Sequence, residues 1–238
     1  MGIAHATVVE VAPIDGQFVV ADEQGVTYRS RGLILAMGVE HVLPQIPDIL
    51  AFAGRSIWHC PECDGYKCME KSIVIMGHDR GSAEMALGVL TWSKRAILCT
   101  LGKPLELDDE CTEKLRAAGV EIVERRIAGI IGNREEGLLE GFELEGGGKL
   151  EASGAFVNAE PTPQHPLLRK LPLVLHKDRW IVVNHRMRTN IPRCYAAGDI
   201  IAHAQTQLSV AMGTGATAAI GLHKELLPPT HCLSGHEW

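Results

Sequence analysis

Two cysteines separated by two residues, Cys60 and Cys63, are the side chains in this sequence best suited to chemistry. Thiols at this spacing can close a small disulfide ring, often at a helix start, where backbone dipoles favour the thiolate. Asp64 follows directly and His59 precedes, so either can take up or release the proton that thiol–disulfide exchange moves. We therefore predict redox exchange at Cys60 and Cys63, with Asp64 or His59 as the acid/base.

Two other interpretations of this cysteine pair stay open. Zinc needs four ligands, and Cys68 or His59 offers a third, but no second pair follows at the usual spacing. The two cysteines can also be packing residues without chemistry. A second cluster of metal-binding residue types, at the C-terminus, is interpreted as a solvated tail. It consists of His231, Cys232 and His236.

Composition narrows the class of protein. The 238 residues carry a formal net charge of -6 and only 5% aromatics, which argues against nucleic acid as a partner. No apolar run reaches the roughly 18 residues of a membrane span, and no signal peptide precedes the first predicted strand. The seven cysteines, an odd number, do not form a disulfide scaffold pattern. We expect a cytoplasmic protein with no membrane partner, whose Cys99 and Cys194 are reduced core residues.

The middle of the chain must position the cysteine pair. Apolar strand-like runs alternate there with segments of helical periodicity, and this order predicts a parallel sheet with right-handed crossovers. A buried strand and glycine-broken hairpins follow. The predicted strands are 72–77, 94–100, 120–124 and 154–159, the predicted helices are 80–93 and 108–118, and the hairpins occupy 128–150.

The two ends of the chain have a different pattern. Three short strands, at 7–11, 17–21 and 25–29, predict an antiparallel meander. Residues 32–38 predict a strand buried on both faces, and residues 43–55 a loop. Strands at 180–183 and 193–199 and a helix at 208–226 complete the prediction. The fold class is α/β, with a three-layer Rossmann-like domain inserted into a partial second domain that carries the meander.

The segment from His59 to Tyr66 resembles the redox motif of low-molecular-weight thioredoxin reductases, flavoenzymes of the pyridine nucleotide-disulfide oxidoreductase class. Further motifs follow in the order of that family and extend the similarity over essentially the whole chain. They are Ala36 to Gly38, which resembles the end of the first flavin segment; Ile73 to Ala86, at the pyridine-nucleotide fold; Tyr195 to Asp199, which resembles the second flavin motif; and Gln207 with Gly213 to Ala216.

The resemblance implies a partial FAD-binding domain at 1–58 and 163–238, and an NAD(P)-binding-like domain with the redox pair at 59–162. It implies that Cys63 faces the flavin, that Cys60 exchanges with the substrate and that Asp64 is the acid/base. It also implies a thioredoxin-like protein or a small-molecule dithiol as partner, and a homodimer. The implied cofactor contacts are Gly38, Gly198, Asp199, Gln207 and Leu208 for FAD, and Gly77 and Ser82 in the nucleotide turn.

The sequence departs from the family in three places. Nothing before Thr7 matches the strand, Gly-x-Gly-x-x-Gly turn and helix that hold the flavin pyrophosphate, so we expect an incomplete FAD site. In the nucleotide turn, Asp79 stands where a glycine lets the backbone approach the pyrophosphate. After the second strand, Lys103 replaces the arginine cluster or acidic residue that would select NADPH or NADH. We therefore expect poor use of NADPH.

The leading hypothesis is a thioredoxin reductase-like, flavin-dependent dithiol/disulfide oxidoreductase. One alternative is a nicotinamide-independent dithiol oxidase, which keeps the cysteine pair and the flavin. The other is a non-catalytic, truncated remnant that binds or regulates a partner.

Overall fold

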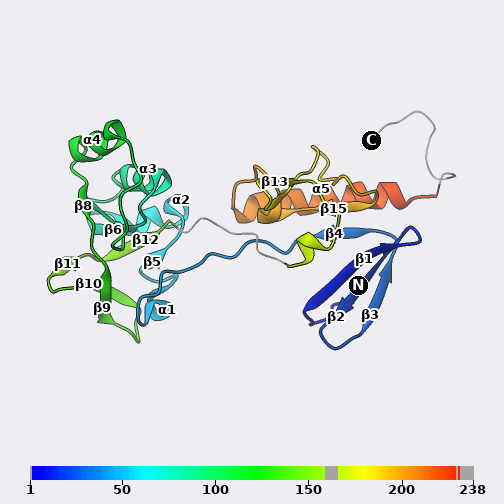
Figure 1. Cartoon of the computed structure of the whole chain (residues 1–238), viewed down its shortest axis with the longest axis horizontal. Helices are drawn as coiled ribbons and strands as arrows, with labels where there is room; N and C mark the ends of the chain where they lie inside the picture. The colour runs from blue at the N-terminus through cyan, green and yellow to red at the C-terminus, as the bar shows by residue number, and fades with distance from the viewer. Residues whose placement is uncertain (1, 159–165, 229, 231–238) are drawn as a thin grey trace. The chain divides into compact units, whose positions relative to one another are not determined.

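Figure 1 shows the computed structural model of the chain, which describes residues 2–158, 166–228 and 230. The backbone forms two compact units, one made of Met1–Glu40 and Pro161–Trp238 and the other of His41–Glu160. The second unit thus begins upstream of residue 59, because α1 (Ile49–Phe52) and β5 (Ile57–Trp58) pack into its core. Helix α1 also corrects the prediction of a continuous loop over 43–55.

A five-stranded parallel sheet forms the centre of the second unit (Figure 1). Its central strand β6 is almost fully buried, as the continuous apolar run predicted. The predicted parallel sheet is confirmed. In spatial order the strands are β5, β12 (Gly154–Val157), β6 (Ser72–Met76), β7 (Arg95–Cys99) and β8 (Glu121–Val123).

Two layers cover the faces of this sheet. On one face lie α3 (Arg80–Val89) and α4 (Asp109–Ala117), and α3 contributes Ala83 and Ala86 to the packing on Ile75 and Leu98. On the other face, an antiparallel sheet packs Phe142 against the parallel strands. The three-layer α/β prediction is confirmed. The antiparallel sheet consists of β9 (Ile127–Asn133), β10 (Leu138–Leu144) and β11 (Lys149–Glu151).

The first unit begins with the predicted meander, made of β1 (Val8–Ile14), β2 (Gln17–Asp22) and β3 (Thr27–Ser30). A core beneath it contains Phe18, Leu35 and Ile181. The remaining elements of this unit are β4 (Leu33–Leu35), η2 (Pro166–Arg169), β13 (Leu175–His176), β14 (Trp180–Ile181), β15 (Cys194–Ala196), η3 (Gly198–Ile200) and α5 (Leu208–Leu226).

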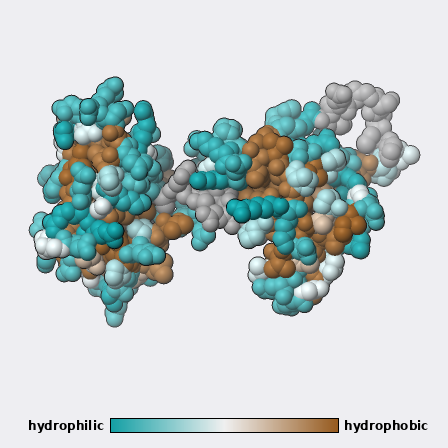
Figure 2. Space-filling model, in the orientation of Figure 1, coloured by the Kyte–Doolittle hydropathy of each residue, from teal (hydrophilic) through white to brown (hydrophobic). Residues whose placement is uncertain are grey.

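Strand β4 is less buried than predicted. It pairs in parallel with β15 in a two-stranded sheet, and Leu33 and Ile34 are only partly buried. Helix α5 covers one face of this pair, where Ile34 packs with Tyr195 and Ala218. Ala218 is the single fully buried residue of this 19-residue apolar helix. Figure 2 shows apolar surface, in brown, on both units.

Candidate functional site

A disulfide joins Cys60 and Cys63, whose Cα atoms are 5.3 Å apart. Cys60 is the N-terminal cap of the short helix α2 (Pro61–Asp64), and Pro61 occupies the first helical position, where its missing N–H costs nothing. The amides of Cys63 and Asp64 both donate to the Cys60 carbonyl at 3.1 Å. The local sequence therefore builds the turn that brings the two sulfurs together.

The two linked cysteines differ in exposure within the second unit. Cys63 is exposed, whereas Cys60 is half-buried. The Cys60 sulfur lies 3.7 Å from Oε2 of Glu62, a neighbour that sequence reasoning missed. A disulfide sulfur has no proton to donate, so this contact places a carboxylate against the sulfur and opposes negative charge on Cys60 once the bond is reduced.

The free cysteines near the pair and in the cores are buried, which disfavours their thiolate forms. Cys68, in the 3-10 turn η1 (Gly65–Cys68), is fully buried, and burial raises the pKa of its thiol to about 11. Burial also raises the pKa of Cys99, and that of Cys194 to about 11. Cys99 and Cys194 are thus the reduced core residues that the sequence predicted.

Asp64, the predicted acid/base, has a cationic partner. Lys67 donates to Oδ1 of Asp64 at 2.7 Å, and this hydrogen bond raises the pKa of the lysine. The Lys67 ammonium also lies 5.6 Å and 5.7 Å from the ring centres of Trp58 and Tyr66. The ion pair with Lys67 therefore holds the Asp64 carboxylate next to the cysteine pair.

His59, the second predicted proton-transfer residue, lies against another histidine. Its ring stacks on His41 with 5.1 Å between centroids, and Nδ1–H donates to the Val157 carbonyl at 3.4 Å. Burial lowers the pKa of His59, and the nearby His41 lowers it further, while the Val157 contact opposes both. The imidazole next to Cys60 is therefore neutral at neutral pH and can accept a proton.

The zinc interpretation finds no support in the described part of the chain. Among those residues, no group of three or more histidine, cysteine, aspartate or glutamate side chains could hold a metal ion. Cys60 and Cys63 are also bonded to each other rather than available as thiolate ligands. The tail cluster of His231, Cys232 and His236 lies outside the described residues.

The nucleotide turn lies between β6 and α3. A Cβ on Gly77 would come within 1.9 Å of the Ser82 hydroxyl, so only glycine allows this close approach. Asp79 caps α3: its Oδ1 accepts from the Ser82 amide at 2.9 Å, the Ser82 hydroxyl at 2.6 Å and the Asn158 amide at 2.8 Å. Sequence reasoning missed Asn158, which follows β12 and is far away in the chain.

The Asp79 carboxylate lies at the N-terminus of α3, in the turn that the family resemblance assigns to a nucleotide. Burial acts to raise the pKa of Asp79, but the hydrogen bonds from Ser82 and Asn158 outweigh it and lower the pKa. Helix N-termini bind anions through free amides and the helix dipole. Here the Asp79 carboxylate accepts the hydrogen bond of the Ser82 amide. The Ser82 amide is therefore already paired within the chain.

The predicted flavin-contact residues lie in the first unit. Gly38 and Gly198 have positive φ angles of 65° and 78°, which favour glycine. The Gly198 amide donates to the Thr214 hydroxyl of α5 at 3.0 Å. Asp199 Oδ1 is buried without a hydrogen-bond partner among the described residues. Buried polar atoms are nearly always paired, so this oxygen fits a hydroxyl donor that comes from outside the chain.

Gln207 and Leu208 form the start of α5, with Gln207 as its N-terminal cap. Leu208 is 78% exposed, although its side chain is large and apolar. Gly38, Gly198, Asp199, Gln207 and Leu208 thus share one unit, and the cysteine pair, Gly77 and Ser82 share the other.

The family described as pyridine nucleotide-disulphide oxidoreductase matches residues 1–215. The chain belongs to this family. A thioredoxin reductase from Streptococcus pyogenes MGAS5005 has a similar structure, with a TM-score of 0.85 and 20% identity, over 93% of this chain and 73% of that one. This likeness confirms a thioredoxin reductase-like fold, as the resemblance implied.

Two curated relatives are oxidoreductases by name. An NADH dehydrogenase from Ferdinandcohnia aciditolerans is 26% identical over 214 residues, which cover 87% of this chain and 41% of the relative. A component of alkyl hydroperoxide reductase from Xanthomonas campestris pv. phaseoli is 24% identical over 240 residues, 95% of this chain and 44% of the relative. The chain thus spans less than half the length of these relatives. Within the described residues, no helix is long and apolar enough to cross a membrane.

Proposed function

We propose that this chain is a flavin-dependent dithiol/disulfide oxidoreductase that uses Cys60 and Cys63 as its redox pair. The observation that carries the proposal is the Cys60–Cys63 disulfide at the start of α2, with one sulfur exposed and an acid/base candidate next to it. The same motif stands in a chain of the pyridine nucleotide-disulphide oxidoreductase family.

In the oxidase direction, a substrate thiolate attacks the Cys60 sulfur, forms a mixed disulfide and expels Cys63 as a thiolate. The second substrate thiolate then breaks the mixed disulfide, which releases the substrate disulfide and leaves Cys60 reduced. The substrate loses two electrons and two protons, and the cysteine pair gains the electrons. Asp64, with His59 as the other candidate, accepts a proton from the attacking thiol and returns it to a leaving sulfur. A reductase runs these steps in reverse.

FAD, when bound, supplies the two-electron chemistry that returns the cysteine pair to its starting state. Gly38, Gly198, Asp199 and the Gln207–Leu208 start of α5 are the residues that would hold it. The unpartnered Oδ1 of Asp199 fits a cofactor hydroxyl. The first unit contains no glycine-rich turn that leads into a helix among its described residues, so we propose that its contacts to the cofactor phosphates are incomplete.

The test uses the full chain, purified and incubated with FAD. We expect a bound flavin spectrum after removal of free FAD, and bleaching of that spectrum by an excess of a small dithiol under anaerobic conditions. Cys60→Ser and Cys63→Ser should retain the flavin but lose dithiol-dependent bleaching, while Cys111→Ser, on α4, serves as the matched control. Full bleaching in both serine variants would mean that electrons reach the flavin without the cysteine pair. No bleaching of the flavin in wild type would favour the non-catalytic remnant.

A second candidate function is a nicotinamide-independent dithiol oxidase. The observation that favours it is the Asp79 carboxylate, which accepts hydrogen bonds from the amide and the hydroxyl of Ser82 at the N-terminus of α3. A second negative charge would have to displace this carboxylate or lie against it, and both cost free energy. In this version of the function, electrons from the dithiol pass to oxygen rather than being supplied by NADPH or NADH.

The two versions differ in nicotinamide binding by the second unit. We expect no saturable binding of NADPH or NADH to wild type in a titration, and detectable binding to Asp79→Gly, which restores the glycine of the turn. Asp108→Gly is the matched control, because Asp108 caps α4 through the Cys111 amide in the same way. Tight binding of NADPH to wild type would overturn the oxidase version and leave the reductase version standing.

The proposal also covers the partner that exchanges disulfides with the cysteine pair. The thioredoxin reductase fold supports a thioredoxin-like protein as the partner, and a small dithiol is the other candidate to exchange with Cys60. We also propose a homodimer, which sedimentation of the purified chain can test. Trapping a mixed disulfide with the Cys63→Ser variant distinguishes the partners, because a protein partner adds its full mass to Cys60.

A further inference from the structure

A lysine follows the cysteine pair, within one helical turn of Asp64. Lys67 lies in η1, and its ammonium nitrogen is 2.7 Å from Oδ1 of Asp64, the last residue of α2. The Lys67 and Asp64 side chains are 35% and 24% exposed, so both remain partly in contact with solvent. The proposed acid/base of the redox centre is thus held by a cation from the next turn of the same segment.

Two aromatic rings help to fix the position of this ammonium. It lies 5.6 Å from the ring centre of Trp58 and 5.7 Å from that of Tyr66, distances at which a ring attracts a cation. Trp58 is buried and packs on Phe156 with 5.5 Å between ring centres, so one of the two rings belongs to the core of the second unit. The hydrogen bond to Asp64 raises the pKa of Lys67, which therefore stays charged.

Lys67 offsets negative charge beside the two sulfurs. The first turn of α2 contains two carboxylates, Glu62 and Asp64, and Glu62 lies 3.7 Å from the Cys60 sulfur. On the other side of Cys60, burial lowers the pKa of His59, so this imidazole adds no positive charge at neutral pH. Thiol–disulfide exchange brings one thiolate to this place and releases another, and like charges oppose both steps. The ion pair neutralises one of the two carboxylates of the turn.

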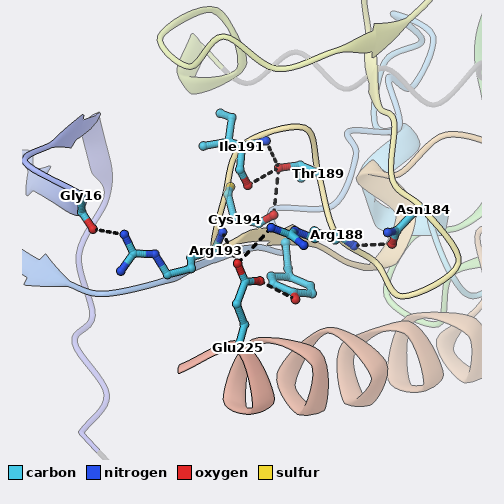
Figure 3. Close-up of polar contacts among 9 residues, drawn as sticks. Gly16, Asn184, Arg188, Thr189, Ile191, Arg193, Cys194 and Glu225 are labelled. Atoms are coloured by element: carbon cyan, nitrogen blue, oxygen red, sulfur yellow. Dashed lines mark hydrogen bonds and ion pairs between the residues drawn. The ribbon is translucent and has the colours of Figure 1, made fainter. Parts of the chain in front are cut away.

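The ion pair of Glu225, in the first unit, has a different setting (Figure 3). Glu225 Oε1 accepts from the Arg188 guanidinium at 3.1 Å, and Oε2 accepts from the Tyr195 hydroxyl at 2.8 Å. These bonds join the end of α5 to β15 and the residues before it, so they hold separate elements together. Asp64 and Lys67, in contrast, are three residues apart in consecutive turns. Their ion pair therefore orders the redox segment itself.

We propose that Lys67 is a positioning residue of the redox centre, which holds Asp64 beside the cysteine pair and offsets its charge when a thiolate approaches or leaves. The inference rests on the function proposed above. In the first exchange step, the incoming thiolate forms a bond to one sulfur of the Cys60–Cys63 disulfide, the bond between the two sulfurs breaks, and its electron pair leaves on the other sulfur. The proton of the incoming thiol goes to Asp64 or to solvent. Lys67 forms no bond in this step, but its charge lowers the cost of bringing an anion into the turn.

The test is reduction of the Cys60–Cys63 disulfide in the full chain by dithiothreitol without FAD, followed by alkylation of the freed thiols and mass spectrometry. Lys67→Met removes the charge and keeps an unbranched side chain, and it should slow reduction about threefold, the scale of a partly exposed ion pair. Lys67→Arg keeps the charge and the attraction to the rings, so it should keep nearly the wild-type rate. Two controls lose a cation from an ion pair elsewhere and should leave the rate unchanged. They are Lys114→Met, on the exposed face of α4, and Arg188→Met, in the Glu225 network.

The charge of the reductant separates this role of Lys67 from a merely structural one. For each thiol, the ratio of the wild-type rate of attack to the Lys67→Met rate cancels the fraction of the thiol that is ionised. The ratio should be larger for mercaptoacetate, whose thiolate carries a second negative charge, than for cysteamine, whose thiolate carries an ammonium. A structural role would change both rates by the same factor.

Three results would overturn the proposal: equal rates in wild type and Lys67→Met, a ratio that does not depend on the charge of the thiol, or a loss in Lys67→Arg as large as that in Lys67→Met. None of these measurements uses the flavin. A wild-type chain whose disulfide exchange depends on Lys67, but whose flavin is not bleached by a dithiol, would therefore contradict the flavin-dependent function and leave the role of Lys67 at the cysteine pair standing.

Discussion

The two units of this chain bury their apolar residues to very different extents. In the second unit, the strands of the parallel sheet have helices on one face and an antiparallel sheet on the other, and Ile73, Val74 and Ile75 are fully buried. In the first unit, α5 buries one residue completely and exposes Leu208, Met212 and Ile220. The difference indicates that the parallel sheet of the second unit is covered on both faces, while α5 leaves large apolar side chains exposed on one face.

The largest effect that tests this contrast is a truncation in the second unit. Phe142 is fully buried between the two sheets, and Phe142→Ala should lower the free energy of unfolding of this unit by about 3–5 kcal/mol. The matched truncation Met212→Ala, on the exposed face of α5, should change it by no more than about 0.5 kcal/mol. Chemical denaturation followed by circular dichroism measures both. A large loss in Met212→Ala would mean that the α5 face is covered in solution, and the contrast would fail.

FAD should act on one unit and not on the other. A ligand at 100 times its dissociation constant stabilises the protein by about 2.7 kcal/mol, and hydrogen exchange localises that gain. We expect added FAD to slow exchange in β15 and the first turns of α5, and to leave β6 unchanged. Asp199→Ala removes the unpartnered oxygen and should abolish the slowing. Equal protection in both units, or protection that survives in Asp199→Ala, would contradict the assignment of the cofactor to the first unit.

Sequence patterns predicted those elements whose stability is local or whose burial is complete. Continuous apolar runs identified β6 and β7, and the predicted helix 208–226 coincides with α5. The pattern failed at α1, because Pro44 and Pro47 indicate a loop while Ile49 and Phe52 turn into a core that forms only in the folded unit. It also overestimated the burial of β4, since periodicity does not reveal how many layers cover a strand.

The sequence predicted some features of the candidate site and not others. The spacing of Cys60 and Cys63 was sufficient to predict their disulfide, because two residues between cysteines close the ring locally. The partners of the site residues were not predictable. Asn158 reaches Asp79 only because β12 lies beside β6, and His41 reaches His59 only through the fold of the second unit. Such contacts depend on topology, which a single sequence pattern does not specify.

The cap of α3 gives a smaller, pH-dependent effect in the second unit. Asp79→Ala should cost about 1 kcal/mol of unfolding free energy, since it removes an N-terminal cap. The pKa of Asp79 is lowered in the folded state, so the stability it contributes is present above the unfolded pKa and is lost as pH falls through the folded value. The difference between wild type and Asp79→Ala should therefore shrink in denaturation curves taken below about pH 4. A difference that grows on acidification would refute this account of the cap.

The smallest effect concerns Glu62, whose carboxylate lies against the Cys60 sulfur. Once the disulfide is reduced, this charge disfavours the Cys60 thiolate, which is the form that reacts. Glu62→Gln should raise the rate at which iodoacetamide modifies Cys60 at pH 7 by about twofold, a modest gain because solvent screens an exposed pair. Mass spectrometry of the Cys60 peptide, with buried Cys99 as an internal reference, measures the rate. Glu151→Gln, an exposed change in β11, should have no effect. An unchanged or slower rate in Glu62→Gln would mean that the carboxylate turns away on reduction, and the half-buried sulfur would then owe its reactivity to α2 and Asp64 alone.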